Sequence, residues 1–354
     1  MNCFKKIQEA YVIRILPTYD VSIFKTATLV HVSDLVKVYR AEDGNWLYCC
    51  NNGISIPYVV ASPDFQQITG YALEIPGEEI VSILMRFLLR TAFESRFCYE
   101  STVSLHAACV EVDGMAVCFT GDSGVGKSTR AMAWHDALGA EFISGDRPAV
   151  RIEKDGGIAC GVPWDGKEQI FRDVERPLKA ILEVRRSPVT HVRKLSSDQA
   201  YHRLIRQCFV PMWDTDTAVL AMANMRKLCR TVPIYRLFCG PDAADAQETY
   251  RILFNHPEEI QEELPEMQLK QGFVLRNVAD EYMVMPTNEN IDKFNGTVVL
   301  SETAAFIFEQ LKQPISREDL LTAMLAEFDV DEATAAKDLD ALLAQFRELG
   351  LLED

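Results

Sequence analysis

The sequence predicts an α/β protein with a phosphate-binding loop in its core and a separate, small α+β module at its C-terminal end. Two observations carry this prediction. Residues 115–138 show a strand pattern, a glycine-rich loop and a helical pattern in that order. Residues 268–352 show three short strand patterns followed by three helical patterns. The length of 354 residues is enough for two or three domains.

Composition and charge exclude several classes of partner. The chain is 48% hydrophobic and 25% charged, as in ordinary globular proteins, with a net charge of −16. This charge repels phosphate backbones and anionic lipids, so we expect neither nucleic acid nor a membrane as partner. Ten scattered cysteines form no C-x-x-C pair, which suits a reducing compartment and argues against a zinc site. Without a signal-peptide pattern or a long apolar run, we expect a cytoplasmic protein.

Residues 1–96 are predicted to form a strand-rich region that flanks the core. The runs "YVIRIL", "LVKVYR" and "WLYCC" have strand character, and Asp43-Gly44 is typical of a hairpin turn. A helix is expected over 76–95, beginning at Pro76, with apolar residues at helical spacing. We expect this region to pack on the core sheet.

The motif "GDSGVGKS", residues 121–128, fits the phosphate-binding pattern G-x-x-x-x-G-K-[ST]. Its glycines let backbone N–H groups wrap closely around phosphates, and the positive end of the following helix points at them. Lys127 would neutralise the β- and γ-phosphates, and the Ser128 hydroxyl would be a ligand of Mg²⁺. The expected nucleotide-contacting residues are Gly121, Asp122, Ser123, Gly124, Val125, Gly126, Lys127, Ser128 and Thr129.

Two further side chains are expected beside this loop. The strand patterns "HAACVEV" and "MAVCFTG" flank Asp113-Gly114, and a two-residue hairpin there places His106 opposite Gly121. The short strand "AEFISGD" ends at Asp146, whose carboxylate could hold Mg²⁺ or accept a proton. The alternatives are that His106 only ends a strand and that Asp146 is a solvated turn residue.

This constellation resembles the HPr kinase/phosphorylase family and its phosphoenolpyruvate-carboxykinase-like relatives. The likeness rests on a strand headed by His, the Asp-Gly hairpin, GDSGVGKS and a strand ending in Asp; it is sharp over 104–150 and faint to about 254. It implies a mixed-sheet kinase domain over 97–255, ATP with Mg²⁺, and phosphorylation of a serine hydroxyl. The family's His, Lys and Ser fall on His106, Lys127 and Ser128. Relatives are often hexamers, which leaves a homo-oligomer open.

The sequence departs from this family at one important position. The family usually has paired aspartates where this chain has Gly145-Asp146, so one carboxylate is missing. If Asp146 is the metal ligand, the base comes from elsewhere, for example His106; if Asp146 is the base, the metal loses a ligand. In place of a later family signature stands "GVPWDGKE", residues 161–168, where Lys167 and Glu168 either contact the nucleotide or acceptor or form a surface turn.

The acidic segment 256–266 is interpreted as a linker, and residues 267–354 as a separate winged-helix-like module. Winged helices often bind DNA, but residues 266–354 contain 7 Lys+Arg and 18 Asp+Glu, a net charge of −11. The stretch "VVLSETAAFIFEQL", the helix pair and the closing "LGLL" resemble PqqD-like domains, the recognition elements of ribosomally made peptide pathways. That resemblance implies capture of a precursor's leader peptide as an added strand, with "GTVVLS" as the edge strand beside helix 332–349.

Together these features favour an ATP-dependent kinase of a ribosomally synthesised precursor peptide. The expected catalytic residues are Lys127 and Asp146 or His106, with Ser128 and Asp146 as metal ligands. Two alternatives stay open. One is a catalytically weak or inactive nucleotide-binding chaperone or sensor, motivated by Gly145; the other is an HPr-type protein kinase or small-metabolite kinase.

Overall fold

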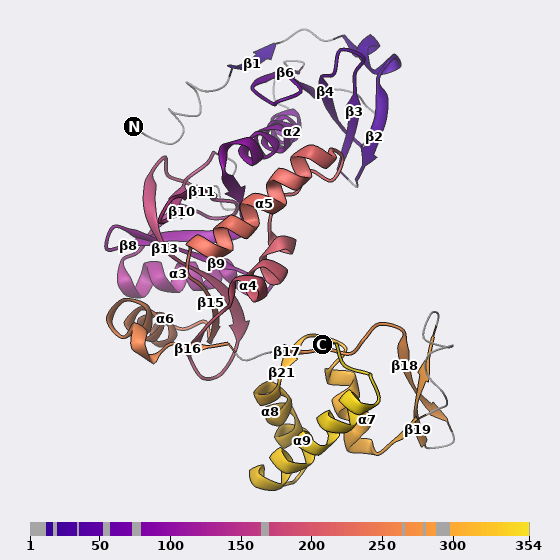
Figure 1. Cartoon of the computed structure of the whole chain (residues 1–354). Coiled ribbons are helices and arrows are strands. Elements are labelled where there is room, and N and C mark those ends of the chain that lie inside the picture. The colour runs from indigo at the N-terminus through magenta and orange to yellow at the C-terminus, as the bar shows by residue number, and fades with distance from the viewer. Residues whose placement is uncertain are drawn as a thin grey trace. The chain divides into compact units, whose positions relative to one another are not determined.

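The chain divides at residue 263 into two units, residues 1–263 and 264–354 (Figure 1). The computed structural model describes residues 12–16, 20–33, 35–51, 57–72, 79–163, 170–263, 266–278, 281–287 and 298–353. None of the helices in these parts of the chain has the length and apolar composition that a bilayer crossing requires.

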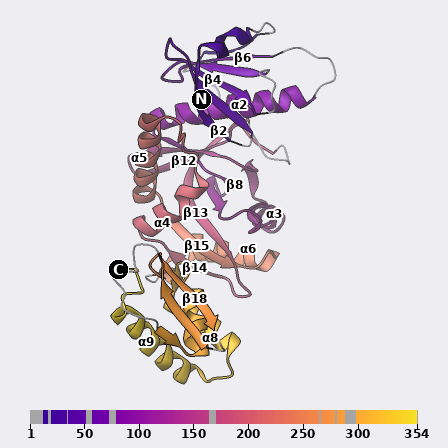
Figure 2. The ribbon, with the colours of Figure 1, turned by 90° about the vertical axis from the view of Figure 1, so that its right-hand side faces the viewer.

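The first unit begins with a six-stranded sheet in the order β1-β6-β5-β4-β3-β2. Its strands are β1 (Val12–Leu16), β2 (Thr28–Val32), β3 (Val36–Arg40), β4 (Trp46–Cys50), β5 (Tyr58–Ala61) and β6 (Gln67–Tyr71). One face packs on helix α2 (Glu79–Phe97), whose Leu88 and Phe93 join the core with Tyr48 and Val59. The same core contains Ala149 from the next sheet, so α2 lies between the two sheets (Figure 2). The helix expected over 76–95 ends two residues later, and Pro76 lies outside the described residues.

A ten-stranded mixed sheet forms the centre of the first unit. Its main path runs β10-β8-β9-β13-β12-β11-β7, and β15, β14 and β16 continue from β13. The long strand β13 lies parallel to both β9 and β15, whereas β8 is antiparallel to β9 and β10. The strands are β7 (Thr102–Ser104), β8 (Ala107–Val112), β9 (Met115–Thr120), β10 (Glu141–Ser144), β11 (Ala149–Glu153), β12 (Gly156–Cys160), β13 (Glu175–Arg186), β14 (His191–Lys194), β15 (Ile234–Cys239) and β16 (Gln261–Glu262).

Helices cover both faces of this sheet because its central strands are apolar on both sides. Trp134 of α3 (Lys127–Leu138) and Ala246 of α6 (Ala243–Tyr250) pack with Val117 and Phe119 on one face. The opposite face is covered by α4 (Ser197–Leu204) and by α5 (Thr215–Thr231), a helix that the sequence analysis did not identify. Figure 2 shows the two helix pairs on opposite sides of β13 and β15.

The interpretation of residues 256–266 as a linker is wrong for most of its length. A 3₁₀ turn spans Pro257–Glu259, and the short strand β16 pairs in parallel with β14. The Glu263 side chain is fully buried. These residues are held by the central sheet because β14 offers them an unpaired edge and basic partners.

In the second unit the three strands of an antiparallel sheet precede three helices, as predicted, and two further short strands, β17 and β21, pair with each other. The antiparallel sheet has the order β18-β19-β20. Its core is formed by residues such as Ile307, Phe308, Leu339 and Phe346. The elements are β17 (Glu266–Met267), β18 (Phe273–Val278), β19 (Glu281–Pro286), β20 (Val298–Leu300), α7 (Glu302–Gln310), β21 (Ile315–Ser316), α8 (Arg317–Glu327) and α9 (Glu332–Glu348).

The last helix of this unit begins at Glu332 as expected and ends at Glu348, one residue earlier than expected. The Asp331 side chain accepts a hydrogen bond from the Thr334 backbone N–H and caps its start. Gly350 follows the helix with φ of 67°. The winged-helix description of the unit stays a prediction.

Candidate active site

The hairpin of β8 and β9 positions both the phosphate-binding loop and His106. Asp113 and Gly114 both have positive φ, 50° and 75°, which is the turn that two-residue hairpins favour. The register pairs Val112 with Met115 and continues to Ala107 with Thr120, as expected. His106 is therefore the next residue opposite Gly121, and its carbonyl accepts a hydrogen bond from Thr120 Oγ1 at 2.9 Å.

The loop after β9 has the backbone that phosphate binding requires. Gly121, Gly124 and Gly126 all have positive φ, of 136°, 78° and 102°. Helix α3 begins directly after the loop, so its free N–H groups and positive dipole end point to the same place. Lys127 Nζ donates to the carbonyls of Gly121 (3.0 Å) and Asp122 (3.2 Å), which hold its ammonium group within the loop.

The loop lies at the C-terminal ends of three parallel strands. Because β9, β13 and β15 run in the same direction, the residues that follow them meet at one edge of the sheet. Arg186, at the end of β13, donates a hydrogen bond to the Gly124 carbonyl. A cavity of about 550 Å³ opens here, lined by the loop and by residues 186–188 and 239–241. The sequence analysis missed these two segments because parallel pairing brings them from far along the chain.

His106 and Asp146 meet beside this loop. The distance between His106 Nε2 and Asp146 Oδ1 is 3.5 Å, and both side chains are partly exposed. Strand β10 ends at Ser144, two residues earlier than expected, and Asp146 lies in the bend that follows. Strand β10 pairs with β8, so the bend after β10 lies next to the residue that precedes β8.

The electrostatics of these groups fit a site for anionic phosphates. Partial burial and the nearby Lys127 and Arg147 cations lower the pKa of His106, against the opposing effect of Asp146. Burial also lowers the pKa of Lys127, while the Asp146 and Asp122 carboxylates act in the opposite direction. Both shifts arise first from burial, which disfavours the charged forms, and a bound phosphate would oppose them with its negative charge.

A buried carboxylate near Asp146, that of Glu94, was missed by the sequence analysis. Glu94 of α2 is only 2% exposed and accepts a hydrogen bond from Ser104 Oγ at 2.6 Å. Arg147 Nη1 and Arg90 Nε each lie 3.8 Å from its carboxylate oxygens. Burial raises the pKa of Glu94 despite these cations. No local pattern marked this residue, because Glu94 lies in an ordinary mixed helical pattern and meets Arg147 only in the fold.

The other predicted site residues have varied environments. Asp122, Ser123 and Thr129 are exposed around the loop, and Ser128 is half-buried in the first turn of α3. Asp122 Oδ2 lies 3.8 Å from Arg185 Nη1. Lys167 and Glu168 lie outside the described residues.

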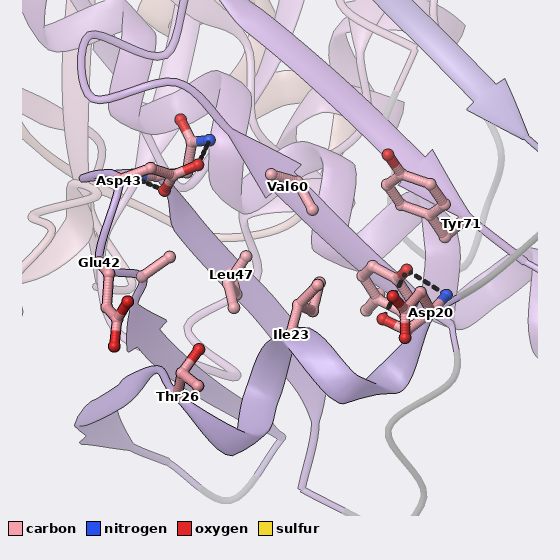
Figure 3. A pocket seen from close by; sticks show the side chains of 11 residues that line it. Asp20, Ile23, Thr26, Glu42, Asp43, Leu47, Val60 and Tyr71 are labelled. Carbon is pink, nitrogen blue, oxygen red and sulfur yellow. Dashed lines mark hydrogen bonds between the residues drawn. The ribbon is translucent and has the colours of Figure 1, made fainter.

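A second cavity, of about 540 Å³, lies on the N-terminal sheet (Figure 3). Leu47, Val60 and Tyr71 form apolar parts of its lining, and the short helix Val21–Lys25 covers it from one side. Three acidic residues, Asp20, Glu42 and Asp43, also line it. This charge disfavours phosphate, so the candidate nucleotide site is the loop and its neighbouring cavity.

Residues 281–352 match the family model described as Coenzyme PQQ synthesis protein D (PqqD). The C-terminal module is PqqD-like. The resemblance predicted from the sequence is thereby confirmed for this part of the chain. No curated protein sequence matches the chain.

Solved structures of low overall similarity include two leader-peptide complexes and an Hpr(Ser) kinase/phosphatase. A structure of TbiB1 in complex with the TbiA(beta) leader peptide is 22% identical, covering 24% of this chain and 94% of that chain, with a TM-score of 0.21. A lasso peptide synthetase B1 complexed with the leader peptide is 20% identical, covering 25% and 99%, with a TM-score of 0.22. The Hpr(Ser) kinase/phosphatase from Coxiella burnetii is 12% identical, covering 44% and 96%, with a TM-score of 0.25.

Proposed function

We propose that this protein is an ATP-dependent kinase that phosphorylates a Ser or Thr hydroxyl of a ribosomally synthesised precursor peptide. The observation that carries the proposal is the meeting of Lys127, His106 and Asp146 at a glycine-rich loop that ends in a helix N-terminus. This arrangement supplies the parts that phosphoryl transfer needs, which are a phosphate cradle, a cation and a proton acceptor.

In the proposed complex the loop holds the triphosphate of ATP, and the cavity beside it holds the nucleoside. The backbone of residues 121–126 has the positive-φ glycines that allow close approach of phosphates. The cavity lined by 186–188 and 239–241 continues from the loop and is of a size that suits a small ligand. Mg²⁺ would be held by Ser128 and Asp146 and would neutralise charge on the phosphates.

In the proposed reaction the acceptor hydroxyl attacks the γ-phosphorus, the bond to the β,γ-bridging oxygen breaks, and ADP leaves. Lys127 stabilises charge on the transferring group. The hydroxyl proton goes to His106 or to Asp146, which lie 3.5 Å apart and share access to the loop. His106 suits this role because its lowered pKa keeps the imidazole neutral at neutral pH.

The PqqD-like unit supports a peptide rather than a small metabolite as the acceptor. Its candidate docking strand β20 lies at an edge of the three-stranded sheet, and Val299 is 55% exposed there. A leader peptide bound as an added strand would satisfy the open backbone groups of that edge. Tethering the precursor in this way raises the effective concentration of its acceptor segment at the kinase site.

The test is incubation of the full chain with Mg²⁺, ATP and a candidate precursor peptide, followed by mass spectrometry of the peptide. The expected result is a gain of one phosphate that requires both the leader segment and Lys127. A peptide that stays unmodified while MgATP binds to the protein would overturn the kinase assignment and leave the peptide-docking unit intact.

A second candidate function is nucleotide-dependent peptide binding without phosphoryl transfer, and Gly145 is the observation that favours it. The Gly145 backbone N–H donates to the Ile170 carbonyl at 2.8 Å, and no side chain is present to supply a second carboxylate. Gly145→Asp separates the two functions. A weak kinase would gain turnover, whereas a binding protein would show unchanged nucleotide and peptide affinities.

A further inference from the structure

A row of charged residues crosses the central sheet from the phosphate-binding loop to the end of the first unit. The sheet register places Glu183 of β13 directly beside Arg236 of β15, and Arg236 beside Arg193 of β14. Arg236 Nε donates to Glu183 Oε2 at 3.0 Å, and both residues are about 95% buried. Such a pair is costly to bury and sensitive to the loss of any partner.

Glu263 completes this row at its far end. Its side chain is fully buried, and its Oε1 lies 3.3 Å from Arg236 Nη1 and 4.0 Å from Arg193 Nη1. One carboxylate therefore lies between two arginines on neighbouring strands, whose positive charges would otherwise repel each other. The Glu263 backbone N–H also donates to the Lys194 carbonyl at 2.6 Å. This residue is thus fixed by both its backbone and its side chain.

The near end of the row contacts the phosphate-binding loop. Glu183 Oε1 lies 2.7 Å from Arg185 Nη2, and Arg185 Nη1 lies 3.8 Å from Asp122 Oδ2. Asp122 belongs to the loop itself. A continuous series of ion pairs therefore runs from Asp122 through Arg185, Glu183 and Arg236 to Glu263.

Glu263 is also the last residue of the first unit, and the chain passes from it directly into the second unit. We propose that Glu263 is a positioning residue for the phosphate-binding loop, so that nucleotide affinity is coupled to the point where the chain leaves the first unit. This inference rests on the proposed nucleotide site. It implies that a change in how residue 263 is held, as when a peptide occupies the second unit, alters the loop through Arg236, Glu183 and Arg185.

The adjacent glutamate offers a matched control. Glu262 is 70% exposed at its side chain and pairs only at the surface with Lys194, at 2.9 Å. We would compare Glu263→Gln with Glu262→Gln in the full chain. The measurements are the Kd of MgATP by isothermal titration calorimetry and hydrogen–deuterium exchange of the amides of residues 121–126.

Glu263→Gln is expected to weaken MgATP binding by about fivefold or more and to speed exchange of the loop amides. The reason is that Arg236 and Arg193 would repel each other without the carboxylate between them. Glu262→Gln should match the wild type in both measurements. In an Arg185→Gln background, Glu263→Gln should have little further effect, since the link to Asp122 is already broken.

Equal affinity and exchange in the two glutamine variants would overturn the inference while leaving the nucleotide site in place. Failure of the wild type to bind MgATP would instead overturn the proposed function. If Glu263→Gln does not fold, Arg185→Gln carries the test, because Arg185 is 40% exposed and a surface substitution there should change folding little. Wild-type MgATP affinity and loop exchange in Arg185→Gln would also overturn the inference.

Discussion

The two units of this protein present their candidate functional groups in opposite ways. In the first unit, function depends on charged side chains, Lys127, His106 and Asp146, which three separate segments bring to one loop. In the second unit, the candidate docking edge offers backbone groups of β20 and apolar side chains such as Val299. Single substitutions should therefore disable the first function sharply, whereas the second should respond mainly to changes in packing.

The largest expected effect tests whether the two units are independent. Phe308 is fully buried in the core of the second unit, where its ring contacts Phe346 edge-on at 6.2 Å between centroids. Phe308→Ala should lower the free energy of unfolding of that unit by about 3–5 kcal/mol, because it removes a large side chain and leaves a cavity. Chemical denaturation followed with and without MgATP separates the transitions, since the proposed nucleotide site predicts that MgATP stabilises only the first unit.

The matched control for this prediction is Leu349→Ala, because Leu349 is 36% exposed at the end of α9. It should change the unfolding free energy by less than about 1 kcal/mol. MgATP affinity should be unchanged in both variants. Loss of nucleotide binding in Phe308→Ala would show that the units depend on each other for folding.

The next prediction removes one charged side chain from the candidate site of the first unit and leaves the second unit unchanged. Lys127→Ala removes the ammonium group that the loop carbonyls hold, and the rate of ATP turnover should fall by about 10²–10³-fold. Lys154→Ala, at an exposed turn between β11 and β12, is the control and should leave the rate unchanged. Thermal unfolding of the second unit should be the same in both variants. A wild-type rate in Lys127→Ala would remove the loop from the mechanism.

Sequence reasoning succeeded where the site is local and failed where it depends on the fold. The loop, the hairpin register and the position of His106 follow from about 25 consecutive residues, because a two-residue turn fixes which residues pair. Glu94, Arg186 and Glu263 could not be found in this way. Each reaches its partner through helix packing or parallel strand pairing, and the sequence around it shows only an ordinary helix, strand or acidic segment.

In the second unit the elements could be predicted from the sequence, but the proposed role could not. Its strands and helices were predicted closely, because Asp331 and Gly350 mark the ends of its last helix and its apolar residues repeat at helical spacing. Its proposed role was not readable from any chemical motif and depended on resemblance. Backbone groups at a sheet edge are the same for every sequence, so the residue pattern alone does not distinguish a docking edge from an ordinary one.

A smaller effect distinguishes two glycines of the loop. Both Gly124 and Gly126 have positive φ, so alanine at either position is strained by about 1–2 kcal/mol. A Cβ at Gly126 would also lie 2.1 Å from Arg130 Nη1, whereas a Cβ at Gly124 meets open space. Arg130 bonds the Val125 and Cys239 carbonyls, so its displacement would disturb the loop and the neighbouring cavity together.

Gly126→Ala should therefore weaken MgATP binding by about tenfold more than Gly124→Ala, as measured by calorimetry. Circular dichroism melting curves serve as the check that both variants are folded. Equal losses of affinity in the two variants would show that backbone strain alone, and not the contact with Arg130, decides the loop geometry.

The smallest effect concerns the proton acceptor. Asp146 lies 3.5 Å from His106 and, together with a hydrogen bond to Gln207, opposes the lowering of the His106 pKa by burial, Lys127 and Arg147. Asp146→Asn should lower this pKa further, because the imidazolium loses its neighbouring negative charge. Titration of the histidine ring protons by NMR measures the shift. Asp155→Asn, in an exposed turn, is the control variant.

Whether the His106 pKa falls or stays unchanged separates two arrangements of the site. If the carboxylate and imidazole form a functional pair, Asp146→Asn keeps His106 neutral to lower pH, and the acid limb of any remaining turnover moves to lower pH with it. If the His106 pKa does not change, the two side chains do not interact in solution. The proton acceptor would then be Asp146 without help from the imidazole, and His106→Asn should leave the pH dependence of turnover unaltered.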